Sequence, residues 1–156
     1  MDEAQALTPI RVVIVDDSAD IRDVLRLALD RQPDFTVVAE AVDGQSGVAV
    51  VNEHKPHLVL LDLAMPVMDG LQALERIKQE SPGTIVVMLT GYAETTGAIS
   101  AVELGAHGYI RKGGGIPELL TQIREVLAHR FQALERAGAR EIARGDPPTR
   151  GAPPGW

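Results

Sequence analysis

The stretch RVVIVDD at residues 11–17 holds four consecutive apolar residues that run without alternation into two aspartates. A run of this kind is typical of a strand that is buried on both faces of a parallel sheet. HLVLLD at 57–62 and TIVVMLTG at 84–91 share the pattern, and each also ends at a polar or small residue. The three runs together predict the centre of a parallel β-sheet.

The segments between these runs have helical spacing of their apolar residues. Weaker strands are predicted at 35–40 (FTVVAE) and 107–110 (HGYI), and weaker helices at 48–51 and 98–104. Strands and helices therefore alternate five times, which requires right-handed crossovers and helices on both faces of the sheet. The predicted class is α/β, a doubly wound parallel sheet. The two clearest helical stripes are Ile21, Val24, Leu25, Ala28 and Leu29, and Leu71, Ala73, Leu74 and Ile77.

A last helix is predicted to begin near Pro117, because proline suits a first helical turn. Phe131 and Leu134 continue its apolar stripe beyond the length that a domain needs, and Gly138 predicts its end. The remainder is rich in arginine, proline and glycine, which is typical of a tail without a packed core. We expect an N-terminal extension at 1–9, one domain at 10–130, and an extended last helix with a tail at 131–156.

Composition excludes several classes of function. The chain has 156 residues, 15 Lys and Arg against 22 Asp and Glu, and no cysteine. A net charge of −7 argues against nucleic-acid binding, and the missing cysteines exclude disulfides, thiolate zinc sites and cysteine nucleophiles. The apolar runs are about five to seven residues long, too short for a membrane span. We expect a soluble, cytoplasmic protein that contacts neither nucleic acid nor membrane.

Carboxylates end two of the predicted central strands. Asp16 and Asp17 follow the first strand and Asp62 ends the third. In a doubly wound sheet the functional crevice lies at the carboxyl ends of the strands, so three carboxylates converge there if these strands are neighbours. Mutual repulsion would raise their pKa values unless a cation neutralised them, and Mg²⁺ prefers such oxygen ligands. A magnesium site is therefore predicted.

Two further polar residues follow the remaining strands. Thr90 closes the fourth strand and Lys112 follows the fifth. A metal ion, a hydroxyl and an ammonium group together neutralise phosphoryl oxygens during transfer to a carboxylate. The pattern predicts that Asp62 is the nucleophile that receives a phosphoryl group.

Four motifs then resemble the receiver domain of two-component response regulators. They are VDDS at 15–18, LDLAMPVMDG at 61–70, MLTGYAE at 88–94 and GAHGYIRKG at 105–113, and the likeness covers roughly residues 10–130. As a set they are highly specific, and the last is closest to receivers of LuxR- and NarL-type regulators. The resemblance implies a flavodoxin-like fold with strand order 2-1-3-4-5.

The resemblance also implies a role for each matching residue. Asp62 would accept the phosphoryl group from the phosphohistidine of a sensor histidine kinase or phosphotransfer protein. Asp17, Asp62 and the backbone carbonyl of Ala64 would bind Mg²⁺, and Asp16 would act through a bound water. The other roles concern the phosphorylated state: Thr90 and Tyr109 would be the switch pair, and Lys112 would pair with the phosphate.

The sequence departs from the family pattern at several positions. Gly113 to Gly115 follow Lys112, where the family usually has a proline, often in a cis peptide, so a looser loop is expected. Gly91 replaces the usual alanine or serine, and Val67 replaces a common glycine. Ala64 and Tyr92 occupy positions that in the family affect how fast the phosphoryl group is lost.

Output and alternative functions remain open at this level. The resemblance implies that the chain is no enzyme beyond its own phosphorylation and dephosphorylation. It implies a protein effector or a homodimer that uses the fourth helix, fifth strand and last helix. The alternative is a receiver fragment of a DNA-binding LuxR-type regulator, although a Pro/Gly tail stands where the recognition helix would follow. A haloacid-dehalogenase-like phosphatase would need a carboxylate where Ala64 stands, so this alternative is disfavoured. A scaffolding pseudo-receiver would normally have lost Asp17, Asp62 or Lys112, and all three are present, so it is disfavoured too.

Simpler interpretations apply to some polar residues. At least one of Asp16, Asp17 and Ser18 is expected to cap the following helix. Asp69, in a DG pair, is expected to form a turn. The four histidines show no metal-ligand spacing and receive no role. They are His54, His57, His107 and His129.

Overall fold

The computed structural model of the chain describes residues 8–91 and 100–144, and the side chains up to residue 137. Five parallel strands form one sheet in the order β2-β1-β3-β4-β5. This confirms the predicted doubly wound sheet and the strand order that the resemblance implied. The strands are β1 (Ile10–Val15), β2 (Phe35–Ala41), β3 (Leu58–Asp62), β4 (Ile85–Thr90) and β5 (Gly108–Arg111).

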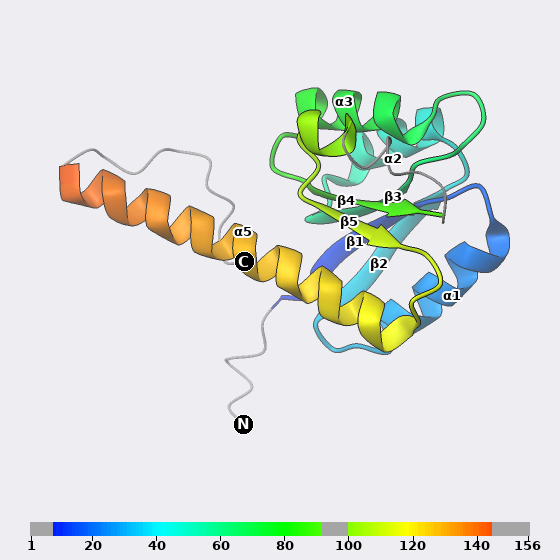
Figure 1. Cartoon of the computed structure of the whole chain (residues 1–156), viewed down its shortest axis with the longest axis horizontal. Coiled ribbons are helices and arrows are strands. Elements are labelled where there is room, and N and C mark those ends of the chain that lie inside the picture. Colours follow the sequence, from blue (N-terminus) through cyan, green and yellow to red (C-terminus); the bar gives the residue numbers. More distant parts are fainter. Residues whose placement is uncertain (1–7, 92–99, 145–156) are drawn as a thin grey trace.

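Helices cover both faces of the sheet. In Figure 1, α2 and α3 lie on one face, whereas α1 and α5 lie on the other. Residues 100–103 are also helical, and the rest of the helix predicted at 98–104 falls partly outside the described residues. The bounds are α1 (Ala19–Asp30), α2 (Gly44–His54), α3 (Gly70–Glu80) and α5 (Ile116–Arg144). No helix within the described ranges has the length and apolar character needed to cross a membrane.

The interior strand β1 shows why the apolar runs do not alternate. Val12 and Ile14 pack into the core on the α1 and α5 side. Val13 and Val15 pack into the core on the α2 and α3 side. All four side chains are fully buried, and each such burial stabilises the fold by about 1.5–3 kcal/mol. A strand that has a core on both faces therefore has no polar face to show in the sequence.

Short polar side chains set the helix starts. Ser18 caps α1, because its hydroxyl accepts a hydrogen bond from the Ile21 N–H at 3.3 Å, so one of the three expected capping residues does cap this helix. Asp69 caps α3 through the Gln72 N–H at 2.9 Å, so its role is structural, although it is a helix cap and not the predicted turn. Asp16 and Asp17 are thereby left for the site at the end of β1.

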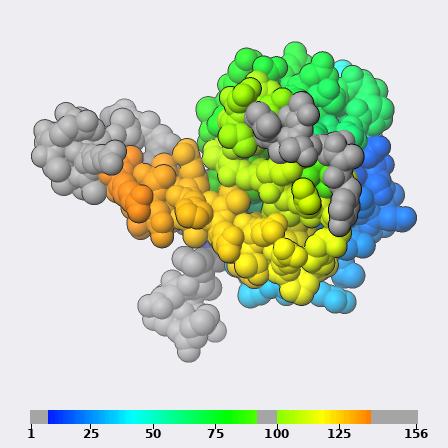
Figure 2. Space-filling view, in the orientation of Figure 1, coloured from blue at the N-terminus to red at the C-terminus, as the bar shows by residue number. Residues whose placement is uncertain are grey.

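Helix α5 continues well beyond the sheet. Figures 1 and 2 show its second half extending away from the body of the domain. The predicted end at Gly138 is wrong, since the helix runs to Arg144. A glycine inside a helix costs only about 1 kcal/mol relative to alanine, and the alanine, arginine and glutamate residues that follow are good helix formers. Phe131 is 43% exposed on this segment.

Two histidines have a structural role that was not predicted from the sequence. The Nδ1 atom of His57 accepts a hydrogen bond from the Arg11 N–H at 3.0 Å. The Nδ1 atom of His107 accepts one from the Val86 N–H at 3.1 Å. The backbone N–H of His57 also donates to the Arg11 carbonyl, and the backbone N–H of His107 donates to the Val86 carbonyl. The two rings therefore complete the hydrogen bonding of parallel strands at the amino edge of the sheet.

Candidate functional site

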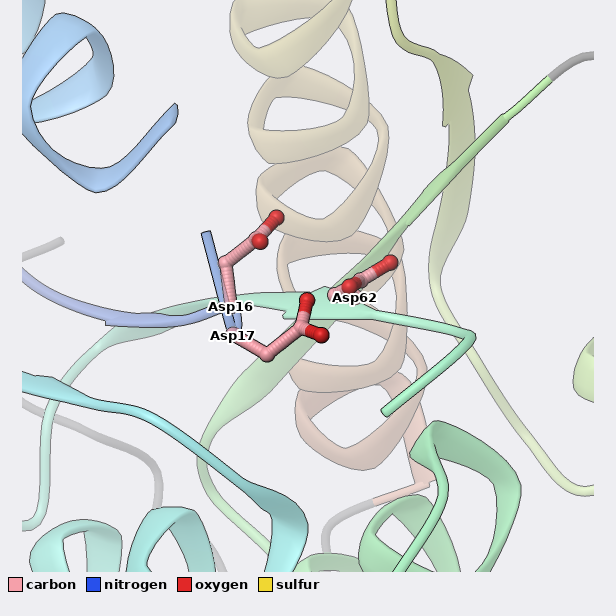
Figure 3. A group of neighbouring side chains, drawn as sticks. All are labelled: Asp16, Asp17 and Asp62. Atoms are coloured by element: carbon pink, nitrogen blue, oxygen red, sulfur yellow. The ribbon is translucent and has the colours of Figure 1, made fainter. Parts of the chain in front are cut away.

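The acidic residues predicted from the strand ends do meet at the carboxyl edge of the sheet. Carboxylate oxygens of Asp16, Asp17 and Asp62 lie within 4.8 Å of one another. Figure 3 shows Asp16 and Asp17 side by side at the end of β1, with Asp62 beside them at the end of β3. The reason is that β1 and β3 are adjacent and in register, with Val15 opposite Leu61. Asp16 and Asp62 are buried, whereas Asp17 is exposed.

A glycine holds the end of β3 close to the start of α3. A Cβ atom on Gly70 would lie only 2.3 Å from the Asp62 carbonyl oxygen, a separation that no side chain tolerates. The Gly70 N–H instead donates to the Leu63 carbonyl at 2.9 Å. The backbone that carries Asp62 is therefore packed directly against the first turn of α3. The DG pair at 69–70 signalled a turn in the sequence, but not this close approach.

Asp16 is held by contacts from several segments of the chain. Its N–H donates to the Ala41 carbonyl at 3.1 Å, and Oδ1 accepts from the Ser18 N–H at 2.9 Å. Its Oδ2 forms an ion pair with the Lys112 Nζ at 2.8 Å. This carboxylate is therefore held by both the loop after β1 and the loop after β5.

Lys112 joins the buried carboxylates. Besides Asp16, its Nζ contacts Asp62 Oδ1 at 3.0 Å. The backbone N–H of Lys112 donates to the Thr90 carbonyl at 2.7 Å. This bond holds the backbone of the lysine against the end of the neighbouring strand β4. A lysine more than forty residues away from either aspartate in the sequence thus becomes their shared counter-ion.

One lysine does not neutralise the cluster. Burial, helped by the charge of Asp16, raises the pKa of Asp62 to about 6 against the opposing effects of Lys112 and the Ala64 N–H. Burial lowers the pKa of Lys112, but its bonds to Asp16 and Asp62 outweigh burial and leave the pKa raised. Three carboxylates therefore face one ammonium group. An all-oxygen set with excess negative charge suits a hard divalent cation such as Mg²⁺, so the residues fit the predicted metal.

Thr90 and Tyr109 lie on the neighbouring strands β4 and β5. Thr90 is buried at the end of β4, and its hydroxyl donates to the Gly91 carbonyl at 3.1 Å. Tyr109, on β5, is half-buried and packs against the core on the α2 and α3 side. Tyr92 lies outside the described residues. The switch roles of Thr90 and Tyr109 and the metal contact of the Ala64 carbonyl stay predictions.

The positions that depart from the family pattern have distinctive backbones. Gly113 and Gly115 have φ angles of 99° and 90°, which glycine adopts without strain. Val67 has φ of 68° and is 80% exposed. A β-branched residue is strained in this region, which explains why glycine is common at this position.

An apolar groove lies next to the lysine. It has a volume of about 470 Å³ and is bounded by α1 on one side and by residues 111–116 on the other. Its apolar walls include Ile21, Val24 and Ile116, and Val24 is 52% exposed. Lys112 itself is among the residues that line this groove.

Residues 12–124 match the family model of the response regulator receiver domain. The chain belongs to the response regulator receiver family. This receiver is 40% identical over 116 residues to YhcZ of Bacillus subtilis, an uncharacterized transcriptional regulatory protein, covering 74% of this chain and 54% of the relative. It is 43% identical over 106 residues to a protein-glutamate methylesterase/protein-glutamine glutaminase of Nitratidesulfovibrio vulgaris, covering 66% of this chain and 28% of the relative.

A solved structure agrees with this assignment. A LuxR-family two-component response regulator from Aurantimonas matches with a TM-score of 0.73 at 31% identity, covering 78% of this chain and 87% of that chain. The receiver spans about half of YhcZ and less than a third of the methylesterase. The likeness is therefore to the receiver part that proteins with different outputs share.

Proposed function

We propose that this receiver accepts a phosphoryl group on Asp62 from the phosphohistidine of a sensor histidine kinase or phosphotransfer protein. The observation that carries the proposal is the position of Lys112, whose Nζ lies 2.8 Å from Asp16 and 3.0 Å from Asp62. A cation held there lies within reach of a phosphoryl group bound to either Asp62 oxygen. The family takes part in two-component signalling, and phosphoryl transfer to Asp62 is the function of that kind that the geometry supports best.

Each residue of the cluster has a part in the transfer. An oxygen of Asp62 attacks phosphorus, a P–O bond forms, and the P–N bond to the donor imidazole breaks, leaving the imidazole to take up a proton. Lys112 would pair with a phosphoryl oxygen as the negative charge moves onto Asp62. Asp17, Asp62 and the Ala64 carbonyl would hold Mg²⁺ directly, and Asp16 through water. When bound, the metal supplies charge neutralisation for the remaining phosphoryl oxygens.

The donor would dock in the groove beside Lys112. Its apolar walls on α1 and Ile116 offer burial to a helix of the donor, and the glycines at 113–115 allow the loop to adapt. The chain's own chemistry would be limited to this transfer and to the later hydrolysis, in which water releases inorganic phosphate from Asp62. The predicted cytoplasmic location is part of the same proposal.

Output would follow from a shift between two conformations. Thr90 would move toward the phosphoryl oxygens and Tyr109 would turn inward, reshaping the surface of β5 and its neighbours. The extended part of α5, with Phe131 exposed, would then meet a protein effector or a second copy. Sedimentation of the double variant Phe131→Ala with Leu134→Ala tests this, and unchanged association in both phosphorylation states would overturn it.

The test of the proposal is incubation with Mg²⁺ and a small phosphodonor such as acetyl phosphate, followed by intact mass measurement. We expect one phosphoryl adduct, which is lost in Asp62→Asn and when the metal is chelated. Asp69→Asn is the matched control, because asparagine also caps helices well and Asp69 lies outside the cluster. No adduct on the wild-type chain, or an adduct that survives in Asp62→Asn, would contradict the proposal.

A further inference from the structure

Arg22 is a partly buried cation directly behind the acidic cluster, and neither the fold nor the proposed transfer assigns it a role. Its side chain on α1 is only 17% exposed. The Arg22 Nη1 donates to the backbone carbonyl of Asp16 at 2.7 Å. This bond is directed at the peptide group between Asp16 and Asp17, not at a carboxylate.

That peptide group sets the backbone position from which the Asp17 side chain projects. The Asp16 carbonyl belongs to the peptide plane that leads into Asp17, and this plane is rigid. The Asp17 side chain is exposed and makes no hydrogen bond or ion pair within the described part of the chain. The place of its carboxylate therefore depends on the backbone that carries it, and Arg22 is the side chain that holds the carbonyl side of that backbone.

Arg22 is itself held from β2. Its Nε lies 3.7 Å from Glu40 Oε1, and Glu40 also pairs with Arg26, one turn further along α1. Glu40 is adjacent to Ala41, whose carbonyl accepts the Asp16 N–H. The end of β2 thus supports the Asp16 backbone twice, directly through Ala41 and indirectly through Glu40 and Arg22.

We propose that Arg22 is a positioning residue for the magnesium site, aligning Asp17 through the Asp16 carbonyl. This inference rests on the proposed function, because it requires that Asp17 binds the metal. Arg22 contacts neither metal nor phosphate, so its loss weakens metal binding without removing a ligand. Outer partners of metal ligands typically contribute about 10–100-fold to affinity.

The experiment compares Mg²⁺ binding by calorimetry in Arg22→Met, Arg22→Lys and Arg124→Met. Arg124 is the matched control, because it is also a helical arginine, with two bonds to Asp34, of 3.1 and 3.0 Å, but it lies at the amino edge of the sheet. We expect Arg22→Met to weaken Mg²⁺ binding about tenfold, Arg22→Lys to restore most of it, and Arg124→Met to bind as the wild type does. Thermal unfolding without metal records the purely structural cost of each variant.

Phosphorylation at different metal concentrations separates positioning from catalysis. A positioning defect disappears at saturating Mg²⁺, so the rate for Arg22→Met should then reach the wild-type rate. If Arg22→Met does not fold, Glu40→Gln replaces it and should weaken binding in the same direction by a smaller factor.

Three outcomes overturn the inference. In the first, Arg22→Met binds Mg²⁺ as tightly as the wild type; in the second, Arg124→Met weakens binding equally; in the third, the rate defect persists at saturating metal. A wild-type chain that binds no Mg²⁺ and takes no phosphoryl group would instead overturn the proposed function and this inference with it. The two failures are therefore distinguishable.

Discussion

The carboxyl and amino edges of the sheet differ in how their ionisable side chains are paired. At the carboxyl edge, Asp16, Asp17 and Asp62 share one ammonium group, and burial leaves Asp62 with a pKa near 6. At the amino edge, His57 and His107 are held neutral and complete the backbone hydrogen bonds of neighbouring strands. Arg124 forms an ion pair there with Asp34 and also donates to the Gln32 side chain.

The comparison shows that unfavourable charge–charge interactions are concentrated at the carboxyl edge. At the amino edge, the rings of His57 and His107 and the guanidinium of Arg124 all have hydrogen-bond or ion-pair partners, as buried polar groups in stable folds generally do. The carboxyl edge keeps like charges close together, which lowers stability in the absence of a cation and prepares a site for one. The stabilising hydrogen bonds of the histidines and the acidic cluster thus lie at opposite ends of the strands.

The largest expected effect tests the amino edge. His107→Leu leaves the buried Val86 N–H without an acceptor, which should lower the free energy of unfolding by about 2 kcal/mol. In His107→Asn the side-chain oxygen occupies a position similar to Nδ1, so most of that loss should be recovered. Urea denaturation measures both variants, and an equal loss in the two would show that the ring's packing matters and not its hydrogen bond.

The same variants have a defined pH dependence. Burial, with smaller effects of Lys78 and Arg130, lowers the pKa of His107 to about 4, and burial also lowers the pKa of His57. A lowered histidine pKa means that its contribution to stability is present above pH 6.5 and is lost as pH falls toward 4. Between these values, His107→Asn should lose less stability than the wild type does.

The next effect tests the carboxyl edge and has the opposite sign. Without Mg²⁺, Asp62→Asn should raise the free energy of unfolding by about 1–2 kcal/mol at pH 8, because it removes a buried charge repelled by Asp16. Since the pKa of Asp62 is raised in the folded state, ionisation destabilises the fold as pH rises through 4 to 6, and the gain should vanish near pH 4. Denaturation at the two pH values checks this, and a destabilised Asp62→Asn at pH 8 would break the comparison between the edges.

The smallest effect concerns backbone strain at the carboxyl edge. Val67 has a left-handed backbone that asparagine adopts more easily, so Val67→Asn should stabilise the fold by about 0.5–1 kcal/mol. Val102→Asn is the control, because Val102 is also exposed, at 65%, but is helical. Stabilisation of both variants to the same extent would indicate a general effect of removing exposed apolar surface.

Several features were predictable because they depend on local pattern. The buried runs identified the central strands, since a parallel strand with a core on each face must be apolar throughout. The carboxylates after those runs identified the acidic edge, because parallel strands end on the same side of a sheet. Strand order required the resemblance to a family, since apolar runs do not state which strand lies beside which.

The sequence by itself therefore determined the strands, the α/β class and the acidic residues of the site. Only the tertiary structure decided that Lys112 pairs with both Asp16 and Asp62, that Gly70 lies against β3, and that two histidines complete strand hydrogen bonds. The physical reason is that hydrophobic periodicity is a property of neighbouring residues in the chain. Ion pairs, close backbone approaches and hydrogen-bond acceptors join residues that become neighbours only after the sheet has formed.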